Sequence, residues 1–331
     1  MLDERKASIL RAVVEEYIKS AQPVGSGLVA DAPGVSVSSA TVRNEMAALE
    51  TDGFLTQPHT SAGRIPTEKG YRYFVDALAE PSLGRAASVQ VKEFFDQAHA
   101  GIEQMLTDTT RLLTGLTDYA AVVIGPHHEA GKIRSVQLVG LAPQVALLVV
   151  VLGNGAVEKR TIDLPAEAND EELARASAHL NTHAIGHPLT TLSQASLSGD
   201  PSLDPLLVAV QTQAGAAEDD TEQVFVTGAS RMAASFEAVE TVRSVLTILE
   251  QQLVVVSLLR DVVDRGLNVA IGSETGMQPL AECALVVAPY TVDGEQVGTV
   301  GVLGPTRMNY PQALAAVAVV GQRLGHRLSE G

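Results

Sequence analysis

The sequence predicts a multidomain α+β protein, and three observations support this fold class. The chain has 331 residues, which is enough for two or three separate hydrophobic cores. Its composition, 46% hydrophobic and 19% charged, is typical of a globular protein. Helical spacing of apolar residues dominates the chain up to Tyr119, strand-like runs joined by turns follow, and helical spacing returns at the C-terminal end.

The sequence also indicates in which cellular compartment the protein is expected. No run of 18 uncharged apolar residues is present, and the first ten residues, MLDERKASIL, contain no apolar signal segment. We therefore expect a soluble, cytoplasmic protein with no membrane attachment. The single cysteine, Cys283, excludes an internal disulfide and a multi-cysteine zinc site. Its strand-like surroundings, AECALVVAPY, predict a small buried side chain.

Charge is distributed unevenly along the chain, whose net charge is −16. Residues 1–75 contain eight Lys/Arg and nine Asp/Glu, whereas the remainder contains fifteen basic and thirty acidic side chains. A strongly acidic body repels phosphate groups. If the protein binds a nucleic acid, the N-terminal quarter must therefore make the contacts.

The N-terminal quarter shows three helical segments followed by a hairpin. The apolar spacing predicts a helix over residues 4–20, a short helix over 26–30, and a third helix from the N-cap Ser38 to residue 52. Strand-like residues 54–56, a polar tip QPHTSAGRIP and a helix capped by Thr67 come next. This order is typical of a winged helix-turn-helix, in which the third helix enters the major groove and the hairpin, or wing, lies along the DNA backbone.

The third helix has two chemically distinct faces. Val42, Met46 and Leu49 share one face and are expected to pack in the core. The opposite face has small hydroxyl residues that allow close approach to a groove, together with Arg43, which can pair with guanine, and Asn44, which can pair with adenine. Basic and polar residues of the hairpin and the following helix would add phosphate contacts. The predicted DNA-binding set is Ser38, Ser39, Thr41, Arg43, Asn44, His59, Ser61, Arg64, Lys69 and Arg72. The alternative is that Ser38 and Ser39 only cap the helix and that Arg43 is a solvated surface cation.

Two stretches of the chain resemble a known family. TVRNEMAALETDGFLTQPHTSAGRIPTEKGYRYFVD near the start and GEQVGTVGVLGPTRMNYPQALAAV near the end are similar to the motifs of the bacterial heat-inducible transcription repressors, the HrcA family. The resemblance implies a winged helix, a GAF-like antiparallel-sheet domain, and an α/β dimerisation domain inserted into it. It also implies a repressor that binds double-stranded DNA at an inverted repeat upstream of chaperone operons and responds to the GroEL chaperonin. We expect this repressor to act as a homodimer.

The strand and helix patterns suggest where these domains divide. The expected boundaries are 1–80 for the winged helix, 81–88 for a linker, 89–163 and 236–331 for the two parts of the GAF-like domain, and 164–235 for the inserted domain. Apolar residues spaced four and three apart from Val91 to Leu116 predict one long helix. That spacing fits either a seam with a second subunit or packing against the protein's own sheet.

Catalysis and cofactor binding find little support in the sequence. No GxSxG motif, P-loop or paired carboxylate motif is present, and we expect no enzyme activity and no cofactor. His127, His128 and Glu129 are adjacent in the chain, and adjacent side chains seldom converge on one metal ion. Two rival functions remain: a small-molecule-responsive GAF-type regulator, with Arg307 and Tyr310 at a pocket mouth, or a protein-interaction module that uses the winged helix.

Overall fold

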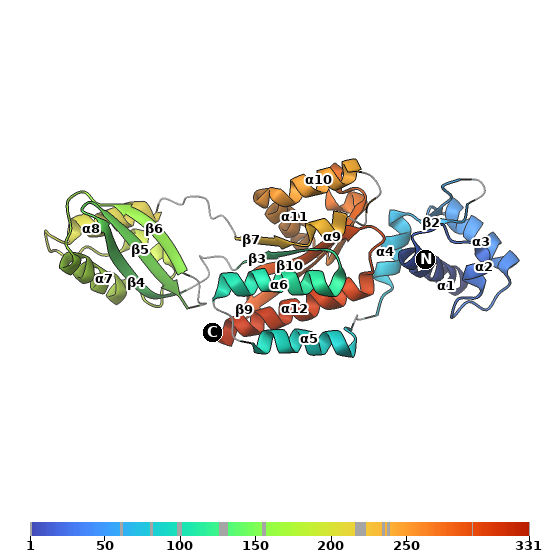
Figure 1. The fold of residues 1–331 in the computed structure, drawn as a ribbon, viewed down its shortest axis with the longest axis horizontal. Coiled ribbons are helices and arrows are strands. Elements are labelled where there is room, and N and C mark those ends of the chain that lie inside the picture. Colours follow the sequence, from blue (N-terminus) through green and yellow to red (C-terminus); the bar gives the residue numbers. More distant parts are fainter. Residues whose placement is uncertain are drawn as a thin grey trace.

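The computed structural model describes residues 2–59, 62–79, 82–97, 101–125, 132–153, 157–215, 223–233, 236, 239–292 and 294–330. In these ranges the protein is elongated, with three regions in a row (Figure 1). We call them the N-terminal region (2–79), the central region (85–125 and 223–330) and the outer region (132–215). Helices combine with three antiparallel sheets, so the structure is α+β, as predicted.

The N-terminal region has the expected order of elements. Its helices are α1 (Glu4–Ser20), α2 (Ser26–Ala30), α3 (Ser39–Thr51) and α4 (Glu68–Asp76), and β1 (Leu55–Thr56) pairs antiparallel with β2 (Ile65–Pro66). Ser38 and Thr67 cap α3 and α4 by accepting hydrogen bonds from the backbone amides of Thr41 and Gly70, at 3.3 Å and 3.2 Å. Val42, Met46 and Leu49 are buried against α1, which confirms the predicted inner face of α3.

The central region is a five-stranded sheet between two layers of helices (Figure 1). The strand order is β7-β3-β10-β9-β8, and every pair is antiparallel. Residues alternate along each strand, so one face packs with α5, α6 and α12 and the other with α9, α10 and α11. The strands are β3 (Ala120–Ile124), β7 (Val224–Thr227), β8 (Val269–Ile271), β9 (Cys283–Val292) and β10 (Glu295–Pro305). The helices are α5 (Arg85–Asp96), α6 (Ile102–Thr117), α9 (Ala229–Ala233), α10 (Val239–Glu250), α11 (Gln252–Asp264) and α12 (Tyr310–Glu330), with the short 3-10 turns η3 (Gly272–Thr275) and η4 (Gln278–Leu280).

The predicted long helix from Val91 to Leu116 is wrong, because the chain forms two helices, α5 and α6. Gln97 after α5 and Gly101 before α6 both have extended backbones, which interrupts the helical hydrogen bonds. Met105, Leu112 and Leu116 of α6 are buried in the protein's own core rather than in an exposed seam. The apolar spacing therefore reports packing within one chain, which was one of the two alternatives.

The outer region is a separate unit with its own core. It contains β4 (Ile133–Ala142), β5 (Val145–Leu152), β6 (Val157–Asp163), α7 (Asp170–Ala184), the 3-10 turn η2 (Leu189–Gln194) and α8 (Asp204–Gly215). The three strands form their own sheet, in the order β4-β5-β6, and one face of it packs with α7 and α8. Our grouping of residues 133–163 with the GAF-like part, and of β7 with the insert, therefore differs from the structure. The interruption of the central sheet runs from β4 to α8.

Both edges of the outer sheet are occupied by amide side chains. On β4, the backbone N–H of Val136 donates to Asn181 Oδ1 at 2.8 Å, and Asn181 Nδ2 donates to the Val136 carbonyl at 2.7 Å. On β6, Gln213 makes the same pair of bonds with the backbone of Asp163, both at 2.9 Å. These bonds use groups that would otherwise pair with another strand.

Two further features of the central region concern buried positions, and the burial of the cysteine agrees with expectation. Cys283 is fully buried in β9. Gly298 of β10 has no room for a side chain, because a Cβ there would lie 2.4 Å from the Tyr290 hydroxyl, which donates to the Ile124 carbonyl at 2.9 Å. Among the described helices none is by itself long and apolar enough to cross a membrane, and α10 and α11 meet that criterion only jointly, as a pair bent by 94°.

Candidate nucleic-acid interface

The outward face of α3 is accessible at its N-terminal half. Ser38, Ser39, Arg43 and Asn44 are exposed, and Thr41 is half-buried. Ser38 does cap the helix, as one alternative held, and its hydroxyl also lies 3.0 Å from that of Thr41. Capping therefore occupies Ser38, while Ser39 extends from the first helical position.

The charges of α3 leave one cation without a counter-ion. The acidic side chains of α3 and its C-cap are each paired: Glu45 with Arg5 at 3.6 Å, Glu50 with Arg64 at 2.9 Å, and Asp52 with Lys6 at 3.3 Å. Within the described ranges, neither Arg43 nor Asn44 makes a hydrogen bond or an ion pair. The accessible face is therefore locally basic, although the whole chain is strongly acidic.

The hairpin is fixed against the helices by Arg64 and its neighbour. The backbones of Arg64 and Val24 exchange two hydrogen bonds of 2.9 Å, so the loop after α1 forms a third strand-like edge. A Cβ on Gly63 would lie 2.4 Å from the Val24 carbonyl oxygen, so only glycine fits there. The Arg64 guanidinium is 16% exposed and donates to Glu50 of α3. Arg64 thus joins the hairpin to α3, a role that the sequence did not indicate.

The other predicted hairpin residues differ in their placement. His59 is exposed at the tip, and Ser61 lies outside the described residues. The Lys69 ammonium donates to the Asp52 carbonyl at 2.8 Å and lies 4.3 Å from the centre of the Phe54 ring. That contact leaves two of its three N–H donors for another partner.

Arg72 does not belong to this surface, and its assignment is corrected. Its guanidinium donates to Glu274 at 2.9 Å and to the Val269 carbonyl at 2.8 Å, both in the central region, and pairs with Asp76 at 3.3 Å. The hydrogen bond to Glu274 raises the pKa of Arg72. The sequence shows no signal for this contact, because Arg72 and Glu274 are 202 positions apart.

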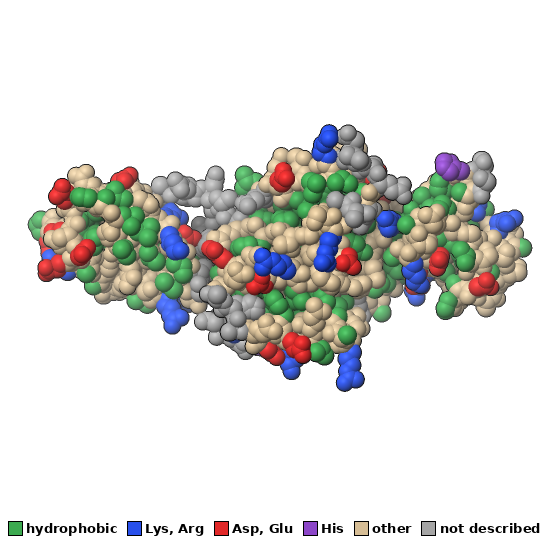
Figure 2. All heavy atoms as spheres, viewed as in Figure 1, with side chains coloured by type: hydrophobic (Ala, Val, Ile, Leu, Met, Phe, Trp, Pro, Cys, Tyr) green, Lys and Arg blue, Asp and Glu red, His purple; other side chains and the backbone are tan. Residues whose placement is uncertain are grey.

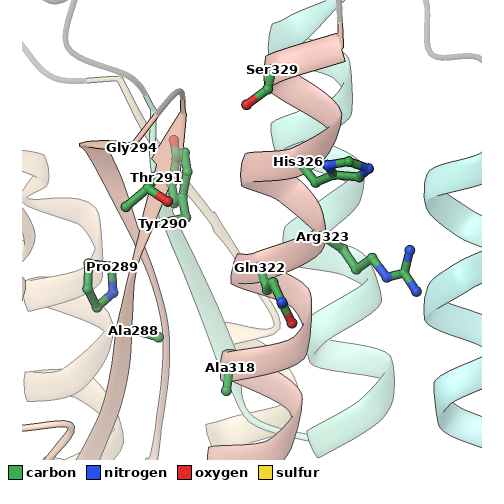
Figure 3. Close-up of a pocket in the computed structure, with 10 residues that line it drawn as sticks. All are labelled: Ala288, Pro289, Tyr290, Thr291, Gly294, Ala318, Gln322, Arg323, His326 and Ser329. Carbon is green, nitrogen blue, oxygen red and sulfur yellow. The ribbon is translucent and has the colours of Figure 1, made fainter.

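The structure also bears on the rival ligand-binding function. Tyr310 does not line a pocket mouth: it is fully buried, and its hydroxyl donates to the Thr306 carbonyl. A cavity of about 740 Å³ lies elsewhere, between β9 and the C-terminal half of α12. Figure 3 shows Arg323 and His326 of α12 pointing away from β9. These two side chains therefore do not point into the space between β9 and α12.

Metal binding finds no site in the described part of the chain, where no group of three or more His, Cys, Asp or Glu side chains is arranged to hold an ion. The adjacent His127, His128 and Glu129 lie outside the described residues.

Comparison with known proteins identifies the family. A family model described as the HrcA protein C terminal domain matches residues 103–314. The heat-inducible transcription repressor HrcA of Streptomyces avermitilis (strain ATCC 31267) is 37% identical over 339 residues, covering 100% of both chains. That of Arthrobacter sp. (strain FB24) is 38% identical over 337 residues, covering 99% of both. A solved structure described as a hypothetical protein shares the fold over 100% of this chain and 99% of its own, with a TM-score of 0.64 and 23% identity. The chain therefore belongs to the HrcA family of heat-inducible transcription repressors.

Proposed function

We propose that this repressor binds an inverted-repeat operator as a homodimer, with the N-terminal region as a winged helix, α3 as its recognition helix and the β1–β2 hairpin as its wing. The observation that supports this most directly is the outward face of α3. There Arg43 and Asn44 have no partner among the described residues, whereas Glu45 and Glu50 are each paired with an arginine. Arginine and asparagine are the side chains that read guanine and adenine in the major groove.

We propose further that the central region is the GAF-like domain and that the outer region is the inserted dimerisation domain. The face of the outer sheet turned away from α7 and α8 supports this. Leu147, Val149 and Val151 run along its middle strand, flanked by Val139 and Val157. Figure 2 shows hydrophobic side chains over these strands. Exposed apolar surface of this kind is typical of a protein interface.

The side-chain hydrogen bonds at the two sheet edges favour one way for a second copy to bind. Asn181 and Gln213 already satisfy backbone groups of β4 and β6. Edge-to-edge strand addition would have to break these bonds, whereas face-to-face packing would not. A face-to-face dimer therefore costs less and places one N-terminal region on each side of a two-fold axis, as an inverted repeat requires.

A binding experiment tests the proposed function. Purified protein is titrated against a fluorescent duplex containing the inverted repeat of a chaperone promoter, and against a scrambled duplex, with and without GroEL. We expect tight, sequence-selective binding that weakens steeply as salt rises, because the acidic body adds no phosphate contacts. GroEL is expected to increase the fraction of active repressor. Equal binding to both duplexes would contradict the proposal.

Arg64 offers a separate test of how the hairpin is held. We expect Arg64→Ala and Glu50→Gln each to weaken operator binding by about 1 kcal/mol without changing base preference, because both remove the same contact between hairpin and α3. The double variant should lose little more than either single variant. The measurement is a double-mutant cycle by fluorescence anisotropy. A loss in Arg64→Ala alone would instead indicate that Arg64 contacts phosphate directly.

A further inference from the structure

We infer that Glu274 and Arg72 are positioning residues for operator binding: they dock α4 onto the central region and thereby set the direction in which α3 faces. This inference rests on the proposed function, since it concerns how the two DNA-binding regions of a dimer are held. Neither residue is proposed to touch DNA.

The contact between α4 and the central region, which we call the dock, is centred on the Glu274 carboxylate. Its two oxygens accept hydrogen bonds from Arg72 of α4 and from the backbone amide of Ile271, the latter at 2.9 Å. Arg265 donates to the Glu274 carbonyl at 2.9 Å, which fixes the turn from its other side. Burial acts to raise the pKa of Glu274, but these hydrogen bonds outweigh it and hold the pKa below its ordinary value. The carboxylate is therefore ionised in this structure, where it pairs with Arg72.

A second polar contact, between a carboxylate and a serine, lies one helical turn earlier on α4. The Glu68 carboxylate accepts hydrogen bonds from the backbone amide of Ser273, at 3.1 Å, and from its hydroxyl. The preceding residue, Gly272, has a φ of +54°, and a Cβ there would lie 2.1 Å from Glu68 Oε1. Glycine at this position therefore serves the dock twice, by allowing the turn and by letting the carboxylate approach. Glu68 and Arg72 are four residues apart and so lie on one face of α4.

Apolar packing also joins α4 to the central region, because buried side chains of the two regions form one continuous cluster. Within it, Tyr71 packs against Tyr310 of α12, with ring centroids 5.8 Å apart and planes tilted by 51°. The Tyr71 hydroxyl is buried, and no partner for it lies among the described residues. Desolvation by burial raises the pKa of Tyr71 well above its ordinary value. Apolar contacts have no preferred direction, so the polar contacts define the angle between α4 and the central region.

The docked arrangement leaves the DNA-binding face open. Figure 1 shows α4 at the junction with the central region, while α3 lies toward the far side of the N-terminal region. Ser39, Arg43 and Asn44 are exposed in this docked state. Docking therefore orients α3 and does not cover it.

Without the dock, only residues 77–84 connect α4 to α5. A connection of this length, with the sequence ALAEPSLG, does not by itself fix an angle between two regions. The second DNA-binding region of a dimer would then search a larger volume before finding its half-site. Its effective concentration, and with it the affinity for the complete inverted repeat, would fall, whereas binding to a single half-site would not.

The test compares complete and half operators. We expect Glu274→Gln to weaken binding to the complete inverted repeat about tenfold and to leave half-site binding unchanged. The control is Asp108→Asn, which breaks an ion pair with Arg111 on α6, away from the junction, and should alter neither affinity. Equal losses on both duplexes, or no loss on the complete repeat, would overturn the inference.

A DNA-independent readout separates this inference from the proposed function. Spin labels at Lys19→Cys and Glu93→Cys, both exposed, report the distance between the two regions in labelled protein diluted with unlabelled protein. Native Cys283 should not react, because burial raises the pKa of its thiol to about 12. Glu274→Gln should broaden the distance distribution. If wild-type protein binds no duplex, the proposed function fails. The distance measurement needs no DNA, so an unchanged distance distribution in Glu274→Gln would reject the dock by itself.

Discussion

Replacing Val139 by Asp is expected to dissociate the homodimer and to weaken binding to the inverted repeat by about 10²–10⁴-fold. Val139 is 46% exposed on β4, opposite Leu147, on the sheet face turned away from α7 and α8. A carboxylate there would have to be desolvated in a face-to-face dimer, and each copy would bring one. In the proposed dimer, linked binding of two half-sites would supply most of the affinity, so its loss should have a large effect.

Sedimentation velocity and operator titration measure the two consequences. The matched control is Val208→Asp on α8, which is 44% exposed in the same region but lies on the helical side of the sheet. That variant should remain dimeric and bind the operator as the wild type does. Binding of a half-site by Val139→Asp should be unchanged, because the N-terminal region is untouched. A dimeric Val139→Asp protein would mean that the copies meet elsewhere.

Replacing Arg43 by Ala is expected to cost about 1–3 kcal/mol of operator affinity and to relax selectivity at one base position. The guanidinium lies in the second turn of α3, on the exposed face, and has no partner among the residues that the structure describes. A bidentate contact with guanine would be lost as a unit, so the wrong bases at that position should then bind nearly as well as the right one.

Titration of single-base operator variants measures this change. Arg11→Ala, which removes an exposed cation from α1, is the control for a general loss of positive charge. It should lower affinity on every sequence by a similar and smaller amount. If Arg43→Ala weakens binding equally on all operator variants, Arg43 is a phosphate contact and α3 reads bases through other side chains.

Local signals were sufficient for the N-terminal region. Caps at Ser38 and Thr67, the end of the third helix at residue 52 and the apolar spacing of α3 all act within one or two helical turns, and each was confirmed. The exposed face of α3 followed directly, because the inner face is defined by the same spacing. The family motifs lie in this part and in β10 and α12, where the predicted strand and helix also agree with the structure.

Such local signals could not predict contacts between segments that are distant in the sequence. Alternating apolar residues predict a strand equally well in either sheet, so the pattern of β4 to β6 did not reveal that these strands leave the central sheet. The spacing from Val91 to Leu116 continued across the break between α5 and α6, because both helices pack on α12.

The sequence by itself therefore determined the elements of the N-terminal region, the inner and outer faces of α3, and the family. Tertiary structure decided which cations remain available on the surface, because an ion pair depends on which side chains folding brings within a few ångströms of one another. Arg43, Arg64 and Arg72 look equivalent along the chain. Yet Arg43 has no partner in the described part of the chain, Arg64 holds the hairpin through Glu50, and Arg72 contacts Glu274.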